Sequence, residues 1–310
     1  MLKYVLKRIV MIIPVVLAVS FIVFFIMDFV PSDPAVTVLG DGATEQQIEY
    51  YRETHGLNDP LPVRYVRYMA GIAKGDLGTS YAQNRPVWDI FFEKFPNTFK
   101  LAIASVIVTV LLSIPLGILA AVKNNTWIDT ICSTLSFVGL AMPNFWLGLL
   151  LIILFSVNLH WLPSTGAVGF QSLILPAITC GTGNMAALTR ITRSSMLDVL
   201  RQDYLRTARA KGQSEGMIIT HHAFKNAQIP VVTQVGIQMS TLLGGAVLTE
   251  RVFAWPGVGA FLVDSIQKSD FEVVTGFVIM LAIFVSIILL IVDVVYAFLD
   301  PRIKAQYSKG

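Results

Sequence analysis

The sequence contains few charged residues and few cysteines. Charged side chains make up 14% of the 310 residues and hydrophobic ones 55%, whereas soluble domains usually carry about 25% charged residues. This composition argues against a water-soluble globule and favours a protein embedded in a membrane. Cys132 and Cys180, the two cysteines, both lie in apolar stretches. They are predicted to be small buried residues, and a disulfide framework or a cysteine-based metal site gains almost no support.

Sequence patterns that carry chemistry are also missing. There is no Gly-x-x-x-x-Gly-Lys-[Ser/Thr] phosphate loop, so this chain is not expected to bind ATP. No Ser/His/Asp set or pair of carboxylates stands out, and the four histidines lack the spacing of zinc ligands. We therefore expect neither an enzyme nor a chain that holds a cofactor or a metal, and no nucleic-acid partner is expected.

Long charge-free stretches predict membrane-spanning helices. A helix needs roughly 20 apolar residues to cross a hydrocarbon core of about 30 Å. The stretches that meet this requirement are residues 9–27, 101–122, 227–249 and 273–292. Residues 130–189 also lack charge, and their 60 residues suit two helices joined at residues 160–166, which contain turn formers and a tryptophan. The sequence therefore predicts an all-α integral membrane protein with six transmembrane helices.

These helices divide the chain into parts. The first helix lies in residues 1–30, and its sequence resembles the start of a signal peptide. Its apolar stretch is longer than the core of a signal peptide, however, and no small-residue cleavage site follows. We therefore expect this helix to stay uncleaved. Residues 31–96 form an extracytoplasmic segment, residues 97–300 a core, and residues 301–310 a cytoplasmic tail. Within the core we expect helices at about residues 97–122, 130–159, 173–194, 230–250 and 272–298, and a cytoplasmic loop at residues 195–230.

The distribution of positive charges predicts that both ends of the chain are cytoplasmic. With the N-terminus inside, the inner segments hold 14 of the 23 lysines and arginines but only six of the 20 acids. The short flanks, residues 3–8 and 302–309, carry lysine and arginine beside the ends of spans, as the positive-inside rule requires.

The extracytoplasmic segment, residues 31–96, is predicted to be helical. Thr44 and Gln47 fit a capping box at the start of one helix, and Gly56 suits its end. A second helix is expected over residues 60–74. This segment either covers the ends of the membrane helices or forms a docking surface for an external partner.

The loop at residues 195–230 is longer than a helical hairpin needs. Apolar residues from Met196 to Leu205 recur at helical spacing among charged ones, which predicts an amphipathic helix. It leads into residues 208–212 (ARAKG), where small residues alternate with cations and the glycine is expected to end the helix. Such a knob suits the groove of a partner, although a solvated basic loop that only satisfies the orientation rule would have the same composition.

Five stretches in order along the chain carry the most specific signal. They are residues 75–80 (GDLGTS), 141–146 (AMPNFW), 203–230, whose ends read DYLRTARAKG and HAFKNAQIP, 253–259 (FAWPGVG) and 299–303 (LDPRI). Together they resemble the permease subunits of ATP-binding cassette (ABC) importers in the dipeptide, oligopeptide and nickel group. The general permease signature begins Glu-Ala-Ala where this chain has Arg206-Thr207-Ala208, a departure that this group shares and that removes any role tied to the glutamate.

The resemblance implies a type I ABC importer permease fold in a bacterial inner membrane. Its implied partners are a second homologous permease, two cytoplasmic subunits that bind ATP and Mg²⁺, and an extracytoplasmic solute-binding protein. The loop around Gly212 would contain the helix that couples this chain to the ATPases. The residues expected there are Ala208, Arg209, Ala210, Lys211, Gly212, Glu215, His221, His222 and Asn226.

Polar residues inside the spans predict the route of the substrate, because such residues are costly against lipid. The candidates, which recur on one helix face or cluster in the preceding span, are Gln234, Gln238 and Thr241 together with Thr179, Thr182 and Asn184. Packing between helices is the alternative role for them. The resemblance favours di- or oligopeptides as substrates, with nickel or a nickel chelate as the alternative. A carrier driven by an ion gradient is the alternative of another class, but the spans offer no ionisable residue at mid-depth.

Overall fold

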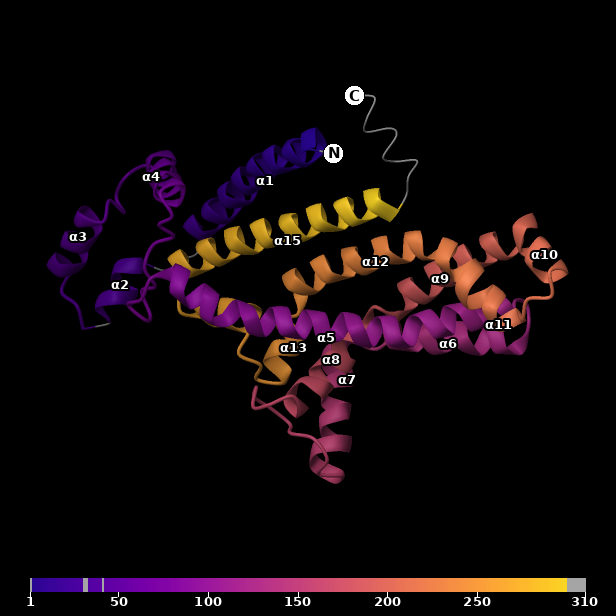
Figure 1. Ribbon diagram of the computed structural model, residues 1–310. Helices are drawn as coiled ribbons and strands as arrows, with labels where there is room; N and C mark the ends of the chain where they lie inside the picture. The colour runs from indigo at the N-terminus through magenta and orange to yellow at the C-terminus, as the bar shows by residue number, and fades with distance from the viewer. Residues whose placement is uncertain (1, 30–32, 41, 300–310) are drawn as a thin grey trace. The chain divides into compact units, whose positions relative to one another are not determined.

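The computed structural model of the protein describes residues 2–29, 33–40 and 42–299 and builds them almost entirely from helices (Figure 1). Within these ranges there is no strand apart from one isolated antiparallel bridge between Thr79 and Pro86. The all-α prediction is confirmed. The helices gather into two compact units, and α1 (Leu2–Asp28), α5 (Val87–Val122) and α15 (Phe271–Leu299) contribute to both.

The N-terminal unit comprises residues 6–98 and 256–287. Besides the starts of α5 and α15, its helices are α1 (Leu2–Asp28), α2 (Pro34–Leu39), α3 (Glu45–Thr54), α4 (Leu61–Ala73) and α14 (Val258–Gln267). In its core Phe91 and Phe277 are fully buried, and their rings meet edge to face with centroids 5.3 Å apart. The Thr98 hydroxyl accepts the N–H of Val258 at 2.8 Å. Aromatic packing and this bond fix the start of α5 against α15 and α14.

The central unit comprises residues 99–255 together with the two ends of the chain. Besides the rest of α5 and α15, its elements are α6 (Trp127–Ala141), α7 (Asn144–Leu151), the π-helix η1 (Ile152–Asn158), α8 (Gln171–Gly183), α9 (Met185–Leu200), α10 (Asp203–Ala210), α11 (Glu215–Met217), the π-helix η2 (Ile218–Ala223), α12 (Phe224–Gly245) and α13 (Val247–Val252). Helix α9 packs against both α12 and α6 (Figure 1). A Cβ at Gly117 would lie 2.8 Å from the Thr189 carbonyl oxygen, so the glycine allows α5 to approach α9 closely.

The predicted helix-capping features of the segment between α1 and α5 are confirmed. Thr44 and Gln47 form the capping box of α3: the Gln47 N–H donates to the Thr44 hydroxyl at 3.3 Å, and the Gln47 side chain accepts the Thr44 N–H at 2.9 Å. Helix α3 ends just before Gly56, which has a φ of +62°. The second predicted helix is α4, Leu61–Ala73.

The predicted number of membrane spans is not confirmed by the helices that the structure describes. In the described part of the chain, three helical stretches are long and apolar enough to cross a membrane: Arg8–Asp28, Val87–Val122 and Phe271–Val295. Helix α6 and the α7–η1 helix together make a fourth if they count as one span, although they meet at 98°. The expected total of six is therefore not confirmed. The other two expected spans correspond to α8 with α9, which is broken at Asn184, and to α12, which contains several glutamines.

Several helix boundaries also differ from the expected ones. Helix α5 begins at Val87, inside the expected segment 31–96, because its first turns pack into the N-terminal core. The expected span 130–159 bends at Pro143, which has no N–H to donate and holds the preceding residue in an extended conformation. The expected loop 195–230 is mostly helical, since α9 continues into it and α12 starts within it. The expected tail, residues 301–310, lies outside the described residues.

Candidate functional site

The segment between α9 and α12, residues 203–226, is here called the knob segment. Its first helix, α10, ends in a Schellman motif: the Gly212 N–H donates to the Arg209 carbonyl at 2.9 Å, and the Gln213 N–H donates to the Ala208 carbonyl at 3.4 Å. Gly212 has a φ of +78°, which residues with a Cβ adopt only at a cost. The predicted helix end at Gly212 is confirmed. A Cβ at this position would meet nothing within 4 Å. Glycine is therefore favoured here by the backbone conformation, and not by crowding within this chain.

The chain returns to helix directly after this turn. The Ser214 hydroxyl accepts the N–H of Met217 at 3.4 Å and so caps the start of α11. From Glu215 to Gly245 the helix then runs without a break through α11, η2 and α12. The knob segment is therefore the beginning of the same continuous helix that carries Gln234 and Gln238.

An apolar core lies beneath the knob segment. Leu205 of α10, together with Ile218 and Ala223 of η2, is fully buried. These side chains cluster with Met196 of α9 and Ala227 of α12. A solvated loop would have no such core, so the segment is a packed structure attached to the ends of two helices.

Polar contacts connect the helices of the knob segment to one another on two sides. The Arg209 guanidinium donates to both carboxylate oxygens of Glu215, at 2.7 and 3.3 Å, and this hydrogen bonding holds the Glu215 pKa below its usual range. On the other side, the Asn226 amide donates to the Tyr204 hydroxyl at 2.7 Å, and that hydroxyl donates to the His222 carbonyl at 3.3 Å. Helix α10 is thus tied to α11 at one edge and to the start of α12 at the other.

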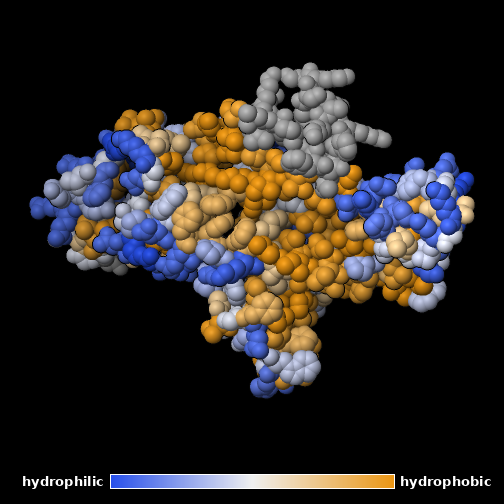
Figure 2. Space-filling model, viewed as in Figure 1, coloured by the Kyte–Doolittle hydropathy of each residue, from blue (hydrophilic) through white to orange (hydrophobic). Residues whose placement is uncertain are grey.

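The outer surface of the knob segment is hydrophilic. Figure 2 shows hydrophilic side chains gathered over α10 and α11, whereas α5 and α6 of the same unit present mostly hydrophobic ones. Among the predicted contact residues, Ala208 and His222 are half-buried, and those that are exposed are Arg209, Ala210, Lys211, Gly212, Glu215, His221 and Asn226. The structure therefore brings the predicted set together on one small, positively charged projection.

The predicted route residues Gln238 and Asn184 meet between α12 and α9. The Gln238 side chain is only 2% exposed, and its Nε2 donates to the Asn184 carbonyl at 3.0 Å. Asn184 lies at the break between α8 and α9, where its own side chain donates to the Cys180 carbonyl at 3.2 Å. The Gln238 Oε1 atom is buried and has no hydrogen-bond partner. In this conformation Gln238 connects α12 to the break instead of facing open space.

The remaining route candidates are not brought to one surface. Thr179 is fully buried and donates to the Leu175 carbonyl at 2.8 Å, while Thr182 is half-buried and donates to the carbonyl of Ile178 at 2.9 Å. Gln234 is half-buried and Thr241 is exposed, although both were predicted on the same face as Gln238.

Sequence reasoning missed an ion pair below the knob segment. Arg193 of α9 donates to both carboxylate oxygens of Asp129 on α6, at 2.7 and 2.6 Å, and also to the Asn124 side chain at 2.8 Å. The Asp129 side chain is 10% exposed and that of Arg193 29%. Arg193 lies inside the expected span 173–194, and a charge in a span demands a partner. That position was the signal that could have revealed the pair.

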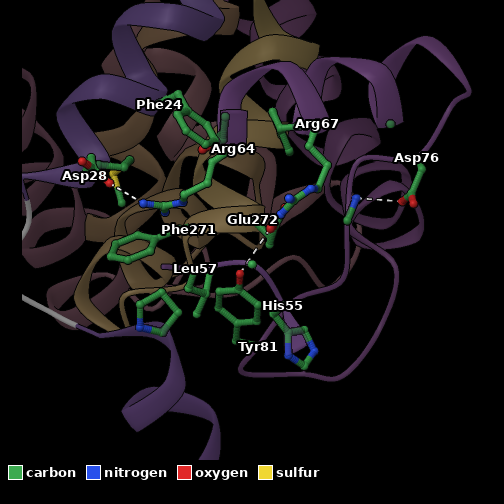
Figure 3. A pocket seen from close by; sticks show the side chains of 17 residues that line it. Phe24, Asp28, His55, Leu57, Arg64, Arg67, Asp76, Tyr81, Phe271 and Glu272 are labelled. Atoms are coloured by element: carbon green, nitrogen blue, oxygen red, sulfur yellow. Dashed lines mark hydrogen bonds and ion pairs between the residues drawn. The ribbon is translucent and has the colours of Figure 1, made fainter. Parts of the chain in front are cut away.

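The N-terminal unit contains a cavity of about 240 Å³ that sequence reasoning also missed. The ends of α1 and α15 line it together with α4 and the chain that follows α4. Figure 3 shows Arg67 reaching from α4 toward the region where Tyr81 meets Glu272, whereas Arg64 of the same helix reaches toward Asp28. The Tyr81 hydroxyl donates to Glu272 at 3.2 Å, and Arg64 donates to Asp28 at 2.6 Å. Burial raises the pKa of the Tyr81 hydroxyl, so it stays protonated and able to donate.

The described residues include no group of three or more His, Cys, Asp or Glu that could hold a metal ion. The charged cavity in the N-terminal unit combines residues from stretches that lie far apart in the sequence, and no single motif predicts such a combination.

Apolar helices of spanning length, broken helices beside them and a packed hydrophilic knob define a membrane-embedded transport subunit. The chain belongs to the family described as binding-protein-dependent transport system inner membrane component, which residues 113–305 match, while residues 1–102 match the N-terminal part of such components. Within that family it is an ABC importer permease of the dipeptide and oligopeptide group, and not an enzyme. The resemblance inferred from the five sequence stretches is confirmed.

Curated relatives align over nearly the whole chain. The glutathione transport system permease protein GsiC of Salmonella paratyphi A is 44% identical over 304 residues, which cover 98% of this chain and 99% of the relative. GsiC of Escherichia coli K12 is 42% identical with the same coverage. Permeases of this class work with ATPase subunits and a binding protein in the inner membrane.

Solved structures support the fold. A chain of the inward-facing MetNI methionine ABC transporter superposes with a TM-score of 0.56 at 16% identity, covering 68% of this chain and 96% of that chain. A second crystal form of the same transporter gives a TM-score of 0.57 at 18% identity with the same coverage. At this level of identity the likeness concerns the fold alone.

Proposed function

We propose that this chain forms, with a second homologous permease, the inner-membrane route for short peptides of the glutathione class. Two cytoplasmic subunits would bind ATP and Mg²⁺, and an extracytoplasmic protein would bind and deliver the peptide. The carrying observation is the alignment of the whole chain with permeases named for glutathione transport. Glutathione is itself a tripeptide and therefore belongs to the di- and oligopeptide class of substrates that the sequence suggested.

The knob segment is the proposed contact with the ATPases. Its buried core joins α10 to the ends of α9 and α12, so a displacement of α10 would be passed to both helices as to a rigid body. Exposed Arg209, Lys211 and His221 would meet the ATPase surface, and the Arg209–Glu215 pair would keep the projection in shape. Transport also requires that nucleotide binding favours one conformation of the permease over the other.

Gln238 is proposed to take part both in the conformational change and in the passage of the substrate. It holds α12 to the break between α8 and α9 through the Asn184 carbonyl, while its Oε1 atom has no donor. Leaving a buried acceptor unpaired costs about 1–3 kcal/mol. A state in which α12 moves from α9 would expose this oxygen to a donor, such as a peptide N–H.

Uptake by the reconstituted transporter tests the substrate. Proteoliposomes containing the permease, its sister, the ATPases and the binding protein should accumulate labelled glutathione when ATP is supplied. Unlabelled tripeptides should compete, and nickel salts should not. Accumulation of nickel without peptide uptake would contradict the peptide proposal and favour the nickel alternative, while uptake without the ATPases would favour an independent carrier.

Labelling tests the proposed orientation, with both ends of the chain in the cytoplasm. A cysteine at Glu49, in α3, should react with a membrane-impermeant maleimide added outside, whereas one at Gln213 should react only after permeabilisation. Both positions are exposed, so access depends on the side of the membrane and not on burial. Reaction of both from one side would refute this topology.

A further inference from the structure

The cavity of the N-terminal unit has an amphipathic lining. Its apolar part is made by Phe24 and Met27 of α1 and by Phe271 of α15, where both helices approach the segment that contains α2–α4. These helices include stretches that are long and apolar enough to cross a membrane. The cavity therefore lies where the apolar part of two spanning helices ends, at the level of lipid headgroups.

The polar part of the lining carries both signs of charge. Arg64 and Arg67 come from consecutive turns of α4, and Glu272 comes from the first turn of α15 (Figure 3). Glu272 accepts one hydrogen bond, from Tyr81, which leaves its second carboxylate oxygen able to accept another. The Tyr68 hydroxyl, also in the lining, is buried and has no partner. A buried hydroxyl without a partner indicates that a polar group completes this site.

We propose that the cavity binds the headgroup of a phospholipid that carries a primary ammonium. Arg64 and Arg67 each pair with a carboxylate of this chain, Asp28 and Asp59 respectively, through one guanidinium nitrogen. Their remaining N–H groups would contact the phosphate of the headgroup, since guanidinium groups bind phosphate oxygens with charge-assisted hydrogen bonds. Glu272 would accept from the ammonium, and the Tyr68 hydroxyl would contact the polar headgroup. The glycerol and the first part of the acyl chains would lie against Phe24 and Phe271.

The surface of α1 identifies a membrane lipid as the source of this ligand. Near the cavity, Phe21 and Phe25 of α1 and Phe29, which directly follows α1, are 48%, 43% and 71% exposed. Such side chains form a surface that acyl chains cover in a bilayer. A headgroup in the cavity could thus keep its acyl chains in the membrane, whereas a water-soluble zwitterion would leave the apolar part of the lining uncovered.

Lipid retention by the assembled transporter tests the site. The complex is purified from nanodiscs of phosphatidylethanolamine and phosphatidylglycerol, and lipids retained on this chain are counted by native mass spectrometry. The wild type should retain phosphatidylethanolamine. Glu272→Gln should lower its retention about tenfold, the loss expected for one charge-assisted hydrogen bond. Glu93→Gln, which changes an exposed carboxylate outside the cavity lining, is the matched control and should retain the lipid.

Two further arms identify the chemistry of the ligand. Phosphatidylcholine has a quaternary nitrogen with no hydrogen to donate. The wild type should therefore retain phosphatidylcholine about as weakly as Glu272→Gln retains phosphatidylethanolamine. The substitution should not lower the retention of phosphatidylcholine any further. Soluble glycerophosphoethanolamine should not displace the lipid. Equal retention by Glu272→Gln and the wild type, or displacement by the soluble compound, would overturn the proposal.

Discussion

The knob segment and the segment that contains α2–α4 are both polar, helical and inserted between apolar helices, yet they are held in different ways. The knob segment has fully buried Leu205 and Ile218 at its base. Helices α3 and α4 contain no buried residue. Burying a leucine contributes about 1.5–3 kcal/mol, so the knob segment has an internal source of rigidity that α3 and α4 lack.

Polar and aromatic contacts hold the segment with α2–α4 instead. Arg64 pairs with Asp28 of α1 at 2.6 Å, and the Tyr65 hydroxyl lies 2.9 Å from that of Ser20. The Tyr65 ring also meets Phe21 edge to face at 5.5 Å. Exposed ion pairs contribute only about 0–1 kcal/mol each. Two segments inserted between apolar helices are thus held by different kinds of contact: one by a buried apolar core, the other by polar and aromatic contacts with α1.

The largest expected effect tests the core of the knob segment. Leu205→Ala should lower the free energy of unfolding of the central unit by about 2–5 kcal/mol, because it leaves a cavity where the side chain was fully buried. ATP-driven uptake should fall strongly. The matched control is Leu39→Ala in α2, where the leucine is 40% exposed and little change is expected.

Thermal unfolding in detergent and uptake in proteoliposomes would be measured for both leucine variants. If Leu205→Ala keeps wild-type uptake and stability, the knob segment does not depend on its core. If Leu39→Ala is equally harmful, the proposed contrast between the two segments is wrong.

A smaller effect is expected for the ion pair between α6 and α9. Asp129→Asn keeps the shape of the side chain but removes the charge that receives two hydrogen bonds from Arg193. The expected loss is about 1.5–3 kcal/mol, the usual contribution of a hydrogen bond to a charged group. Asp59→Asn in the N-terminal unit is the control: its partner Arg67 is 55% exposed, so the loss should stay below about 1 kcal/mol. Equal shifts in the midpoint of thermal unfolding would show that burial does not distinguish the two pairs.

The smallest expected effect concerns the turn at Gly212. Gly212→Ala should cost about 1 kcal/mol, because alanine is strained at a φ of +78° although there is room for its Cβ. Gly212→Asn should be milder, since asparagine tolerates this region better. Gly216→Ala, with room for a Cβ and no positive φ, is the control.

Substrate-stimulated ATP hydrolysis and thermal stability would be compared across the three glycine variants. The expected order of loss is Gly212→Ala, then Gly212→Asn, with Gly216→Ala near the wild type. If the loss of ATP hydrolysis instead increases with the size of the side chain at position 212, and does not depend on how well the residue tolerates a positive φ, position 212 is in close contact with the ATPase.

Local and compositional features of the fold could be predicted from the sequence. Charge-free runs predicted the helical membrane class, and the pair Thr44 and Gln47 predicted a capping box, because both depend on neighbouring residues alone. The bend at Pro143 could not be predicted as a 98° turn. A proline removes one hydrogen bond, but the direction of the following helix depends on the contacts of α7 with α8 and α13.

The candidate site was predictable to a similar extent. Alternating small and cationic residues before Gly212 predicted an exposed projection, but not the buried Leu205 and Ile218 beneath it. Helical spacing placed Gln234 and Gln238 on one face, yet spacing does not determine which part of that face a neighbouring helix covers. Gln238 meets α9 for that reason, and long-range contacts of this kind leave no local pattern.

The winding of the π-helix η2 determines the direction in which the side chains of α12 point. An α-helix turns about 100° per residue, and a π-helix bonds to the residue five positions away instead of four. Because η2 lies inside the continuous helix from Glu215 to Gly245, its winding determines the angular phase of every later side chain, including Gln238. A local rewinding of η2 to α-helical geometry would rotate α12 about its own axis without moving its ends far. The geometry of the knob segment thus sets the direction in which Gln238 points.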